Sequence, residues 1–162
     1  MVIIRAADES DWDQIYPFFH AIVSAGETYA YADDMTSAQA RDIWLEQPPG
    51  LTVVAVADGH VVGSAKMGPN RPGRGAHVAT ASFMVDPAHA RRGIGRAMGE
   101  YALDWAQAAG FRSMQFNAVV ESNAAAVALW QALGFTIIGT VPAAFDHRRL
   151  GLVGLHVMYL SL

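Results

Sequence analysis

The stretch "DPAHARRGIGRAM", Asp86–Met98, decides the fold, because it sets a glycine-rich turn between a strand and a helix. Three arginines and two glycines stand close together in it: Arg91, Arg92, Gly93, Gly95 and Arg96. Glycine lets the backbone approach an anion, and a helix N-terminus offers unpaired N–H donors and the positive end of its dipole. Arginine adds charge-assisted hydrogen bonds to phosphate. The stretch therefore predicts either a phosphate-binding turn or a solvated, positively charged helix start.

Two common nucleotide-binding patterns do not fit this turn. A Walker loop requires the triplet Gly-Lys-Ser or Gly-Lys-Thr, which the sequence does not contain. A dinucleotide-binding fingerprint requires Gly-x-Gly-x-x-Gly or -Ala directly after a strand. Here Met98 takes the last position, Gly99 comes one residue too late, and several residues separate Gly93 from the end of the strand. Both patterns are therefore excluded, and the turn alone leaves its two interpretations open.

The composition is that of a globular chain with an acidic balance. The 162 residues are 52% hydrophobic and 16% charged, with a formal net charge of -4. This length and composition predict one folded domain, residues 1–162, with a buried core. An acidic chain lacks the broad basic surface that nucleic-acid binding needs. The arginines of the turn therefore form a local positive spot that suits a small anion.

Several chemistries and locations are excluded by what the sequence lacks. There is no cysteine, hence no disulfide, no thiolate zinc site and no cysteine nucleophile. Neither a His-Glu-x-x-His motif nor a calcium-loop pattern is present, so we expect no metal. The N-terminus does not read as a signal peptide, and no apolar run approaches the roughly 18 residues of a membrane helix. We therefore expect a cytoplasmic protein without a nucleic-acid or membrane partner.

Periodicity and turn residues predict a mixed α/β domain. Pro17 is expected to split or kink the first helix, and Asp58-Gly59 to turn a hairpin. The sequence predicts strands at residues 1–7, 77–87, 112–120, 135–141 and 154–162, with the hairpin at 52–68 and a loop at 142–151. It predicts helices at residues 8–26, 37–47 and 122–134, and another from the glycine-rich turn to residue 109.

A second segment separates the two interpretations of the turn. "NAAAVALWQALGF", Asn123–Phe135, together with "FMVDPAHARRGIGRAMGEYALDWA", resembles the GNAT superfamily of acetyl-CoA-dependent N-acetyltransferases. The loop of that family has the form Gln/Arg-x-x-Gly-x-Gly/Ala, from which this chain departs only at Ala90. The resemblance covers nearly the whole chain. It implies the GNAT fold, a mixed, mostly antiparallel sheet of six to seven strands flanked by about four helices, with acetyl-CoA as co-substrate and no metal.

The resemblance also implies which residues hold acetyl-CoA. The loop residues that would bind the pyrophosphate are Arg91, Arg92, Gly93, Ile94, Gly95 and Arg96. The preceding strand would pair its backbone with the pantetheine arm at Phe83, Met84 and Val85. The N–H of Val85 would face the thioester carbonyl and stabilise the oxyanion, and a bulge would splay this strand from the next. Asn123 would reach the pantetheine arm, or serve only as the N-cap of its helix.

The acid and base of the reaction are less regular in this chain. Trp130 is expected to contact the cofactor, but it stands where the family often has the tyrosine that protonates the leaving thiolate, and an indole N–H is not a useful acid. Either another group supplies that proton, or the thiolate leaves without it. Glu27 is the candidate base and a substrate contact, with a solvated loop carboxylate as the alternative. Asn117, an amide inside an apolar strand, is expected to be buried and to serve catalysis and substrate binding, beside Tyr29 and Thr80.

A narrower likeness bears on the acceptor. The wording "NAVVESN" and "VPAAF" resembles the branch that contains the yeast azetidine-2-carboxylate acetyltransferase, although Thr80 replaces an asparagine of that branch. We expect transfer of the acetyl group to the amine of a small molecule, an amino acid or an analogue, by direct attack in a ternary complex. A non-catalytic acyl-CoA sensor and a protein N-terminal or lysine acetyltransferase are the alternatives. A homodimer is a further expectation, because homodimers are common in this family.

Overall fold

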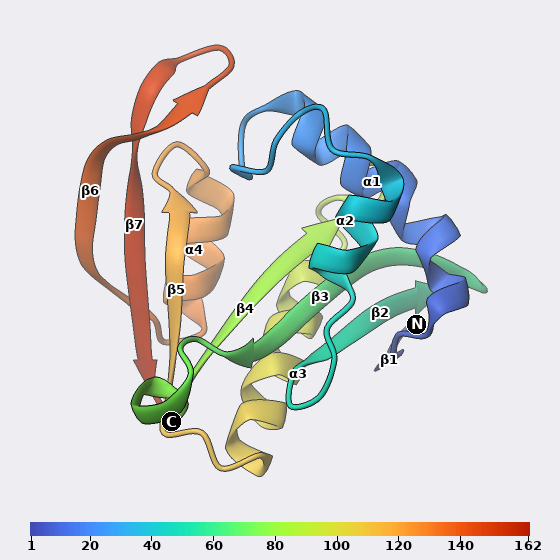
Figure 1. Ribbon diagram of the computed structural model, residues 1–162, viewed down its shortest axis with the longest axis horizontal. Helices are drawn as coiled ribbons and strands as arrows, with labels where there is room; N and C mark the ends of the chain where they lie inside the picture. Colours follow the sequence, from blue (N-terminus) through green and yellow to red (C-terminus); the bar gives the residue numbers. More distant parts are fainter.

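The computed structural model describes residues 1–162 as one sheet with helices on both faces (Figure 1). The strands are β1 Val2–Ala6, β2 Leu51–Ala57, β3 His60–Pro69, β4 Val78–Val85, β5 Ser113–Val120, β6 Thr136–His147 and β7 Gly151–Ser161. The helices are α1 Trp12–Ala25, α2 Ser37–Trp44, α3 Ile94–Ala108 and α4 Ala124–Ala132. The strand order is β1-β2-β3-β4-β5-β7-β6, and only β4 and β5 pair in parallel. The predicted mixed, mostly antiparallel sheet with about four helices is confirmed.

The sheet buries an apolar core on each face, because successive residues of a strand point to opposite sides. Val53 of β2 belongs to the core that takes Met98 of α3 and Trp130 of α4. Its neighbour Val54 belongs to the core that takes Phe19 of α1. Each helix thus attaches to the sheet through its apolar side. None of the helices combines the length and the apolar character needed to cross a membrane.

Buried hydrogen bonds fix the end of α2 to the sheet. The indole N–H of Trp44 donates to Ser64 Oγ at 2.8 Å, and Ser64 Oγ donates to the Val53 carbonyl at 2.8 Å. The Thr52 hydroxyl donates to the Trp44 carbonyl at 2.8 Å. A buried polar group without a partner costs about 1–3 kcal/mol, so this chain of bonds defines one position for the helix. The segment between α1 and α2, which covers the functional site, is thereby held at its far end.

Two local predictions have opposite outcomes. Asp58 and Gly59 have left-handed backbones, with φ of 50° and 78°, so the predicted hairpin turn is confirmed. The prediction that Pro17 splits the first helix was wrong, because α1 continues through it. Pro17 lies on the exposed side of α1, where water can bond the one carbonyl that its missing N–H leaves free.

The predicted loop at residues 142–151 was wrong in its extent. β6 continues to His147 and pairs with β7, with register irregularities that include one between Val141 and Phe145. Ala143, inside this irregularity, has a φ of 50°. Pro142 also lies inside this irregularity, where no residue of β7 pairs with it, so its missing N–H removes no bond between the two strands. The Pro-containing stretch therefore reads as a loop in sequence but folds as a bulged strand.

β4 and β5 separate soon after they meet. They pair only at residues 78–79 against residues 113–114, and beyond that point β4 stays on β3 while β5 stays on β7 (Figure 1). The register irregularity lies in β5, between Phe116 and Val119, whereas β4 keeps an unbroken register with β3. The predicted separation of the two strands is confirmed, and its bulge belongs to β5.

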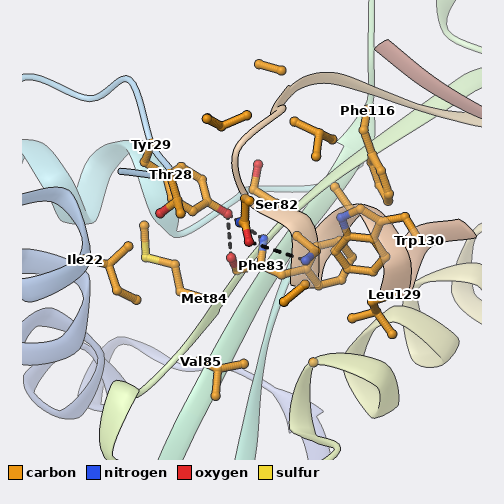
Figure 2. A pocket seen from close by; sticks show the side chains of 18 of the residues that line it. Ile22, Thr28, Tyr29, Ser82, Phe83, Met84, Val85, Phe116, Leu129 and Trp130 are labelled. Atoms are coloured by element: carbon orange, nitrogen blue, oxygen red, sulfur yellow. Dashed lines mark hydrogen bonds between the residues drawn. The ribbon is translucent and has the colours of Figure 1, made fainter. Parts of the chain in front are cut away.

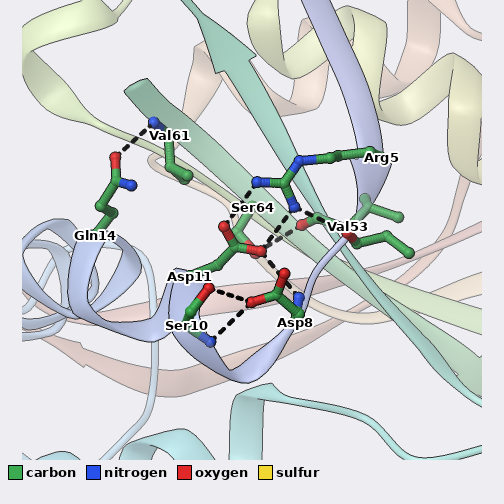
Figure 3. Close-up of polar contacts among 9 residues, drawn as sticks. Arg5, Asp8, Ser10, Asp11, Gln14, Val53, Val61 and Ser64 are labelled. Atoms are coloured by element: carbon green, nitrogen blue, oxygen red, sulfur yellow. Dashed lines mark hydrogen bonds and ion pairs between the residues drawn. The ribbon is translucent and has the colours of Figure 1, made fainter. Parts of the chain in front are cut away.

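An ion pair ties β1 to the start of α1 (Figure 3). The Arg5 guanidinium donates to both carboxylate oxygens of Asp11 at 2.8 Å, and the N–H of Asp8 donates to Asp11 Oδ2 at 2.9 Å. Asp11 is buried, while Arg5 stays partly exposed. The hydrogen bond from Arg5 lowers the pKa of Asp11, and desolvation acts in the opposite direction. The pair therefore stabilises the charged form of a buried carboxylate.

Asp11→Asn is expected to lower the free energy of unfolding by about 1–3 kcal/mol near neutral pH, because charge-assisted hydrogen bonds are lost. The pKa of Asp11 is lower in the folded chain than in the unfolded chain, so its stabilisation is present above about pH 4 and is lost as the pH falls further. Urea unfolding at about pH 7 and about pH 2.5 measures both effects. Asp13→Asn, on the exposed side of α1, is the control. A deficit as large at low pH as at neutral pH would contradict this account.

Candidate functional site

A cleft of about 900 Å³ lies where β4 and β5 separate (Figure 2). Its walls are mostly apolar and come from β4, β5, the glycine-rich turn, α4 and the segment before α2. Small-molecule sites commonly have this form, an apolar hollow with a few placed polar groups. The cleft is therefore the candidate site, and its polar groups decide what it can bind.

The glycine-rich turn brings backbone donors to one end of the cleft. Arg91 and Gly93 both have left-handed backbones, with φ of 62° and 76°, and Gly93 is the N-cap of α3. Alternation of left-handed with other conformations points successive N–H groups to one side, which makes a nest for an anion. A Cβ at Gly93 would meet no atom within 4 Å, so the space beside the turn is open. This geometry is that of an anion-binding turn at a helix N-terminus.

The predicted loop residues do not contribute equally to the cleft. Those that line it are Arg91, Gly93, Ile94, Gly95 and Arg96. Arg92 is exposed and does not line the cleft, so its position lends no support to a role in cofactor binding. Arg96 Nε pairs with Glu100 at 2.9 Å, one turn along α3, whereas Arg91 has no ion-pair partner. Arg91 is thus the arginine of the turn that both lines the cleft and has no ion-pair partner.

One edge of β4 faces the cleft with its backbone. The N–H of Asp86 donates to the Val62 carbonyl at 2.9 Å, which sets the alternation of the antiparallel pair. In that alternation Met84 bonds across to β3, whereas the N–H and C=O groups of Phe83 and Val85 point away from β3 and into the cleft. Of the three predicted strand residues, Phe83 and Val85 therefore offer backbone groups to a ligand, while Met84 only lines the wall.

The Tyr29 hydroxyl already occupies one of these positions. It donates to the Phe83 carbonyl at 2.5 Å and accepts from the Phe83 N–H at 2.9 Å (Figure 2). Its ring stacks on Tyr31, with centroids 5.6 Å apart and planes at 8°, and meets the edge of Trp44 at 6.4 Å. Burial raises the pKa of the Tyr29 hydroxyl, and the neighbouring Tyr31 raises it further. Tyr29 was expected in the pocket, but nothing in the sequence indicates its two hydrogen bonds to the backbone of β4.

The opposite wall of the cleft comes from α4. Trp130 is buried and packs on Phe83, with centroids 4.6 Å apart, and on Phe116 at 4.9 Å. Its indole N–H has no hydrogen-bond partner in the protein, and the residue lines the cleft. The side-chain oxygen Oδ1 of Asn123 accepts from the N–H of Ala126 at 3.3 Å, so Asn123 is the N-cap of α4, which was one of its two predicted roles. Its amide nitrogen has no protein partner, and the residue also lines the cleft.

Asn117 is exposed, so the prediction of a buried amide was wrong. The bulge between Phe116 and Val119 places it outside the regular alternation of β5. Its Nδ2 donates to Asn70 Oδ1 at 2.6 Å, and its Oδ1 accepts from Gln115 Nε2 at 2.9 Å. The residue still lines the cleft, as Thr80 does. A substrate contact therefore stays a prediction for Asn117 and Thr80.

Glu27 does not have the position expected of a base. Its Oε1 accepts from Arg149 Nε at 2.8 Å, an ion pair between the α1–α2 segment and the β6–β7 turn. The residue lines neither the cleft nor the second cavity described below. A general base must first reach the proton it removes. The position of Glu27 therefore favours the alternative interpretation, a carboxylate engaged at the surface.

A second cavity of about 510 Å³ lies between the β6–β7 hairpin and the segment after α1. It shares the walls Tyr29, Ala30, Tyr31 and Phe145 with the cleft. Its polar groups are Asp33, Asp146 and Arg148, of which Arg148 and Asp33 pair at 3.0 Å. Arg148 and Asp33 were missed in the sequence, where they read as loop charges. No group of three or more histidine, aspartate or glutamate side chains is close enough to hold a metal ion.

One family of known proteins is similar to this chain in sequence and in structure. The model of the acetyltransferase (GNAT) family matches residues 12–135. A solved GCN5-related N-acetyltransferase from Kribbella flavida is 58% identical, covers 99% of this chain and 98% of its own, and superposes with a TM-score of 0.97. The structure of yncA from Salmonella typhimurium with its cofactor acetyl-CoA is 26% identical, over 100% of this chain and 94% of that one, with a TM-score of 0.83.

Two further relatives are named by activity. N-acetyltransferase aca1 of Schizosaccharomyces pombe is 29% identical over 78% of this chain and 68% of its own length. The L-methionine sulfoximine/L-methionine sulfone acetyltransferase of Salmonella typhimurium is 30% identical over 86% of this chain and 82% of its own length. Their similarity extends over most of the present chain.

Gly93→Glu is expected to abolish measurable acetyl-CoA binding, because a carboxylate would enter the open space beside the turn and juxtaposed like charges cost several kcal/mol. Gly59→Glu is the matched control, since Gly59 has a φ of 78°, close to the 76° of Gly93, and equally open space. Both variants carry the same backbone strain, so both lower the melting temperature. Isothermal calorimetry of acetyl-CoA binding then distinguishes the two variants, because only Gly93→Glu should lose affinity. Wild-type affinity for acetyl-CoA in Gly93→Glu would place the phosphate site elsewhere.

Proposed function

The chain belongs to the GNAT family of acetyltransferases, and on that premise we propose that it acetylates the amine of a small molecule, an amino acid or a close analogue. Membership makes it an N-acetyltransferase that uses acetyl-CoA as co-substrate. The observation that carries the choice of acceptor is the second cavity, which shares Tyr29 and Phe145 with the cleft. An amine held there lies next to the cleft in which we place the acetyl donor.

The charges of the second cavity suit a zwitterion. Arg148 can bind a carboxylate through two parallel hydrogen bonds, while Asp33 and Asp146 can attract the ammonium group. The pair between Arg148 and Asp33 is half-exposed, and pairs of this kind are worth about 0–1 kcal/mol. Exchanging it for a substrate carboxylate therefore costs little. The Salmonella relative named for L-methionine sulfoximine and L-methionine sulfone supports an acceptor of this chemistry.

We place acetyl-CoA in the central cleft, with its pyrophosphate at the turn of Arg91 and Gly93. The pantetheine arm carries amide groups, which can pair with the edge of β4 that faces the cleft as an added strand would. The N–H and C=O groups of Val85 are free for this pairing, whereas those of Phe83 are bonded to the Tyr29 hydroxyl. The role predicted for the Val85 N–H at the thioester carbonyl has a second candidate in the Phe83 N–H, which faces the cleft from the same edge of β4. Asn123 contributes an unpaired amide nitrogen from the opposite wall.

The reaction is a direct transfer in a ternary complex. The amine nitrogen attacks the thioester carbonyl carbon, the C–N bond forms, the C–S bond breaks, and sulfur leaves as the thiolate of CoA. The nitrogen loses one proton to water as the amide forms. Before the attack, the ammonium form of the acceptor gives up another proton to a base, which frees the lone pair. Asp146 lines the second cavity without an ion-pair partner, so we assign it this role in place of Glu27, which would first have to leave Arg149. This sequence needs no acylated residue.

Three broader expectations are part of the same proposal. Residues 1–162 act as one domain, the protein works in the cytoplasm, and it associates with a second copy of itself. The edge strand β6 supports the last of these, because its apolar side chains Ile138 and Val141 are 60% and 52% exposed. An exposed apolar edge strand is a template for pairing with another chain. Sedimentation velocity would report the association directly.

A screen of acceptors by thiol release tests the proposed function. We expect release of CoA thiol from acetyl-CoA with free amino acids or their analogues, L-methionine sulfone, L-methionine sulfoximine and azetidine-2-carboxylate included. Peptides with free N-termini or lysine side chains serve as the comparison set. Turnover with peptides alone would make the protein a protein acetyltransferase. Tight acetyl-CoA binding without turnover across both sets would make it a sensor.

Arg148→Gln is expected to raise the KM of the acceptor about 10- to 100-fold, because a hydrogen bond to a charged group is worth about 1.5–3 kcal/mol. The KM of acetyl-CoA should stay unchanged, since Arg148 does not line the cleft. Arg149→Gln removes the same charge from the same turn but outside the cavity, and it is the control. Equal acceptor KM values in the two variants would refute the assignment of the carboxylate partner.

A further inference from the structure

The Tyr29 hydroxyl satisfies both backbone groups of Phe83, and those groups belong to the edge of β4 that faces the cleft. Tyr29 also lines both cavities, so Phe83 marks the place where the cleft and the second cavity meet. Val85 lies two residues closer to the phosphate-binding turn. The acetyl group has to meet the amine at this junction, which favours Phe83 over Val85 as the residue beside the thioester.

We propose that the Tyr29 hydroxyl and the Phe83 N–H together hold the thioester carbonyl oxygen and form a two-donor oxyanion site. The proposal rests on the placement of acetyl-CoA argued above. The hydroxyl oxygen and the amide nitrogen are 2.9 Å apart, so a single acceptor oxygen can lie within hydrogen-bond distance of both. Without ligand the two donors occupy each other and the Phe83 carbonyl. When the thioester oxygen arrives, the hydroxyl hydrogen rotates from the Phe83 carbonyl toward it, and the Phe83 N–H is shared between the hydroxyl oxygen and the arriving oxygen.

The two donors stabilise the charge that forms on the carbonyl oxygen during the reaction. As the amine nitrogen bonds to the carbonyl carbon, the C=O electron pair moves onto oxygen, where both donors bind it. The pair returns as the C–S bond breaks and the thiolate leaves. Tyr29 keeps its proton throughout, because a phenol with a raised pKa is a weaker acid than a thiol, whose pKa is about 8.5. Tyr29 is therefore an oxyanion donor and not a substitute for the acid that Trp130 cannot supply.

The surroundings of Tyr29 hold its hydroxyl in place. Its ring lies flat on Tyr31, which stacks in turn on Phe19 of α1 at 5.6 Å, and it meets Trp44 of α2 edge-on. Both helices are packed on the sheet, and Trp44 is bonded to Ser64. A donor fixed in an apolar site pays no reorganisation when charge develops, which is why such donors act chiefly on the transition state.

Tyr29→Phe tests the proposal, because it removes the hydroxyl and keeps the ring. With L-methionine sulfone as acceptor, kcat is expected to fall about 100- to 1,000-fold, the usual effect of losing one oxyanion donor. The dissociation constant of acetyl-CoA should rise at most about tenfold, the value of one hydrogen bond to the neutral carbonyl of the ground state. Tyr16→Phe, the same change on α1 in the same apolar core and outside both cavities, is the control. An unchanged kcat in Tyr29→Phe would overturn the proposal.

A pair of CoA ligands gives a readout that a structural role would not move. S-acetonyl-CoA keeps a carbonyl near the thioester position, and S-propyl-CoA has a methylene there. Tyr29→Phe is expected to weaken the ketone ligand about three- to tenfold, the value of one hydrogen bond, and to leave the propyl ligand unchanged. Equal weakening of both ligands would show that Tyr29 only supports the loop, and would overturn the proposal. Failure of either ligand to bind the wild type would instead contradict the placement of acetyl-CoA itself.

Discussion

The parting of β4 from β5 is the constraint on which the rest of the site depends. Two neighbouring strands pair at residues 78–79 and 113–114 and then diverge, which leaves one edge of β4 without a strand partner inside the sheet. Backbone groups in such a place must find other partners, because an unpaired buried N–H or C=O is costly. Tyr29 meets this requirement at Phe83. The remaining edge is open to a ligand with amide groups of its own.

Aromatic side chains keep the two strands apart. Trp130 contacts Phe83 on β4 and Phe116 on β5, and Phe116 stacks on Phe135 at 4.3 Å. Such aromatic pairs each add about 0.5–1.5 kcal/mol of stability beyond that of their burial, so Trp130 is held firmly between the two strands. Gly99 of α3 leaves the room it needs, since a Cβ there would lie 2.9 Å from Trp130. The tryptophan at the position of the family's usual tyrosine thus has a packing reason.

What the sequence predicts correctly is governed by local chemistry. The glycine-rich turn before α3, the hairpin at Asp58 and the cap at Asn123 each depend on a few adjacent residues, and all three appear in the structure. What the sequence does not reveal is the contacts between distant parts of the chain. Glu27 meets a partner 122 residues away, and Asn117 leaves the buried face because of a bulge whose position depends on the pairing of β5 with β7. Residue type alone carries no signal of either contact.

The proposed oxyanion site gives a reason why acetyl transfer would not need a dedicated acid. A thiol has a pKa of about 8.5, so a thiolate is a tolerable leaving group near neutral pH, and protonating it is not the demanding step. The demanding step is the charge that collects on the carbonyl oxygen as the amine attacks, in a cleft whose walls are mostly apolar. Hydrogen bonds to that oxygen strengthen as the charge grows, and only interactions stronger in the transition state raise the rate. A chain that places a packing tryptophan at the acid position can therefore remain an efficient catalyst, provided that fixed donors face the oxygen. Phe83 supplies one through its backbone, and the hydroxyl nearest to it is that of Tyr29.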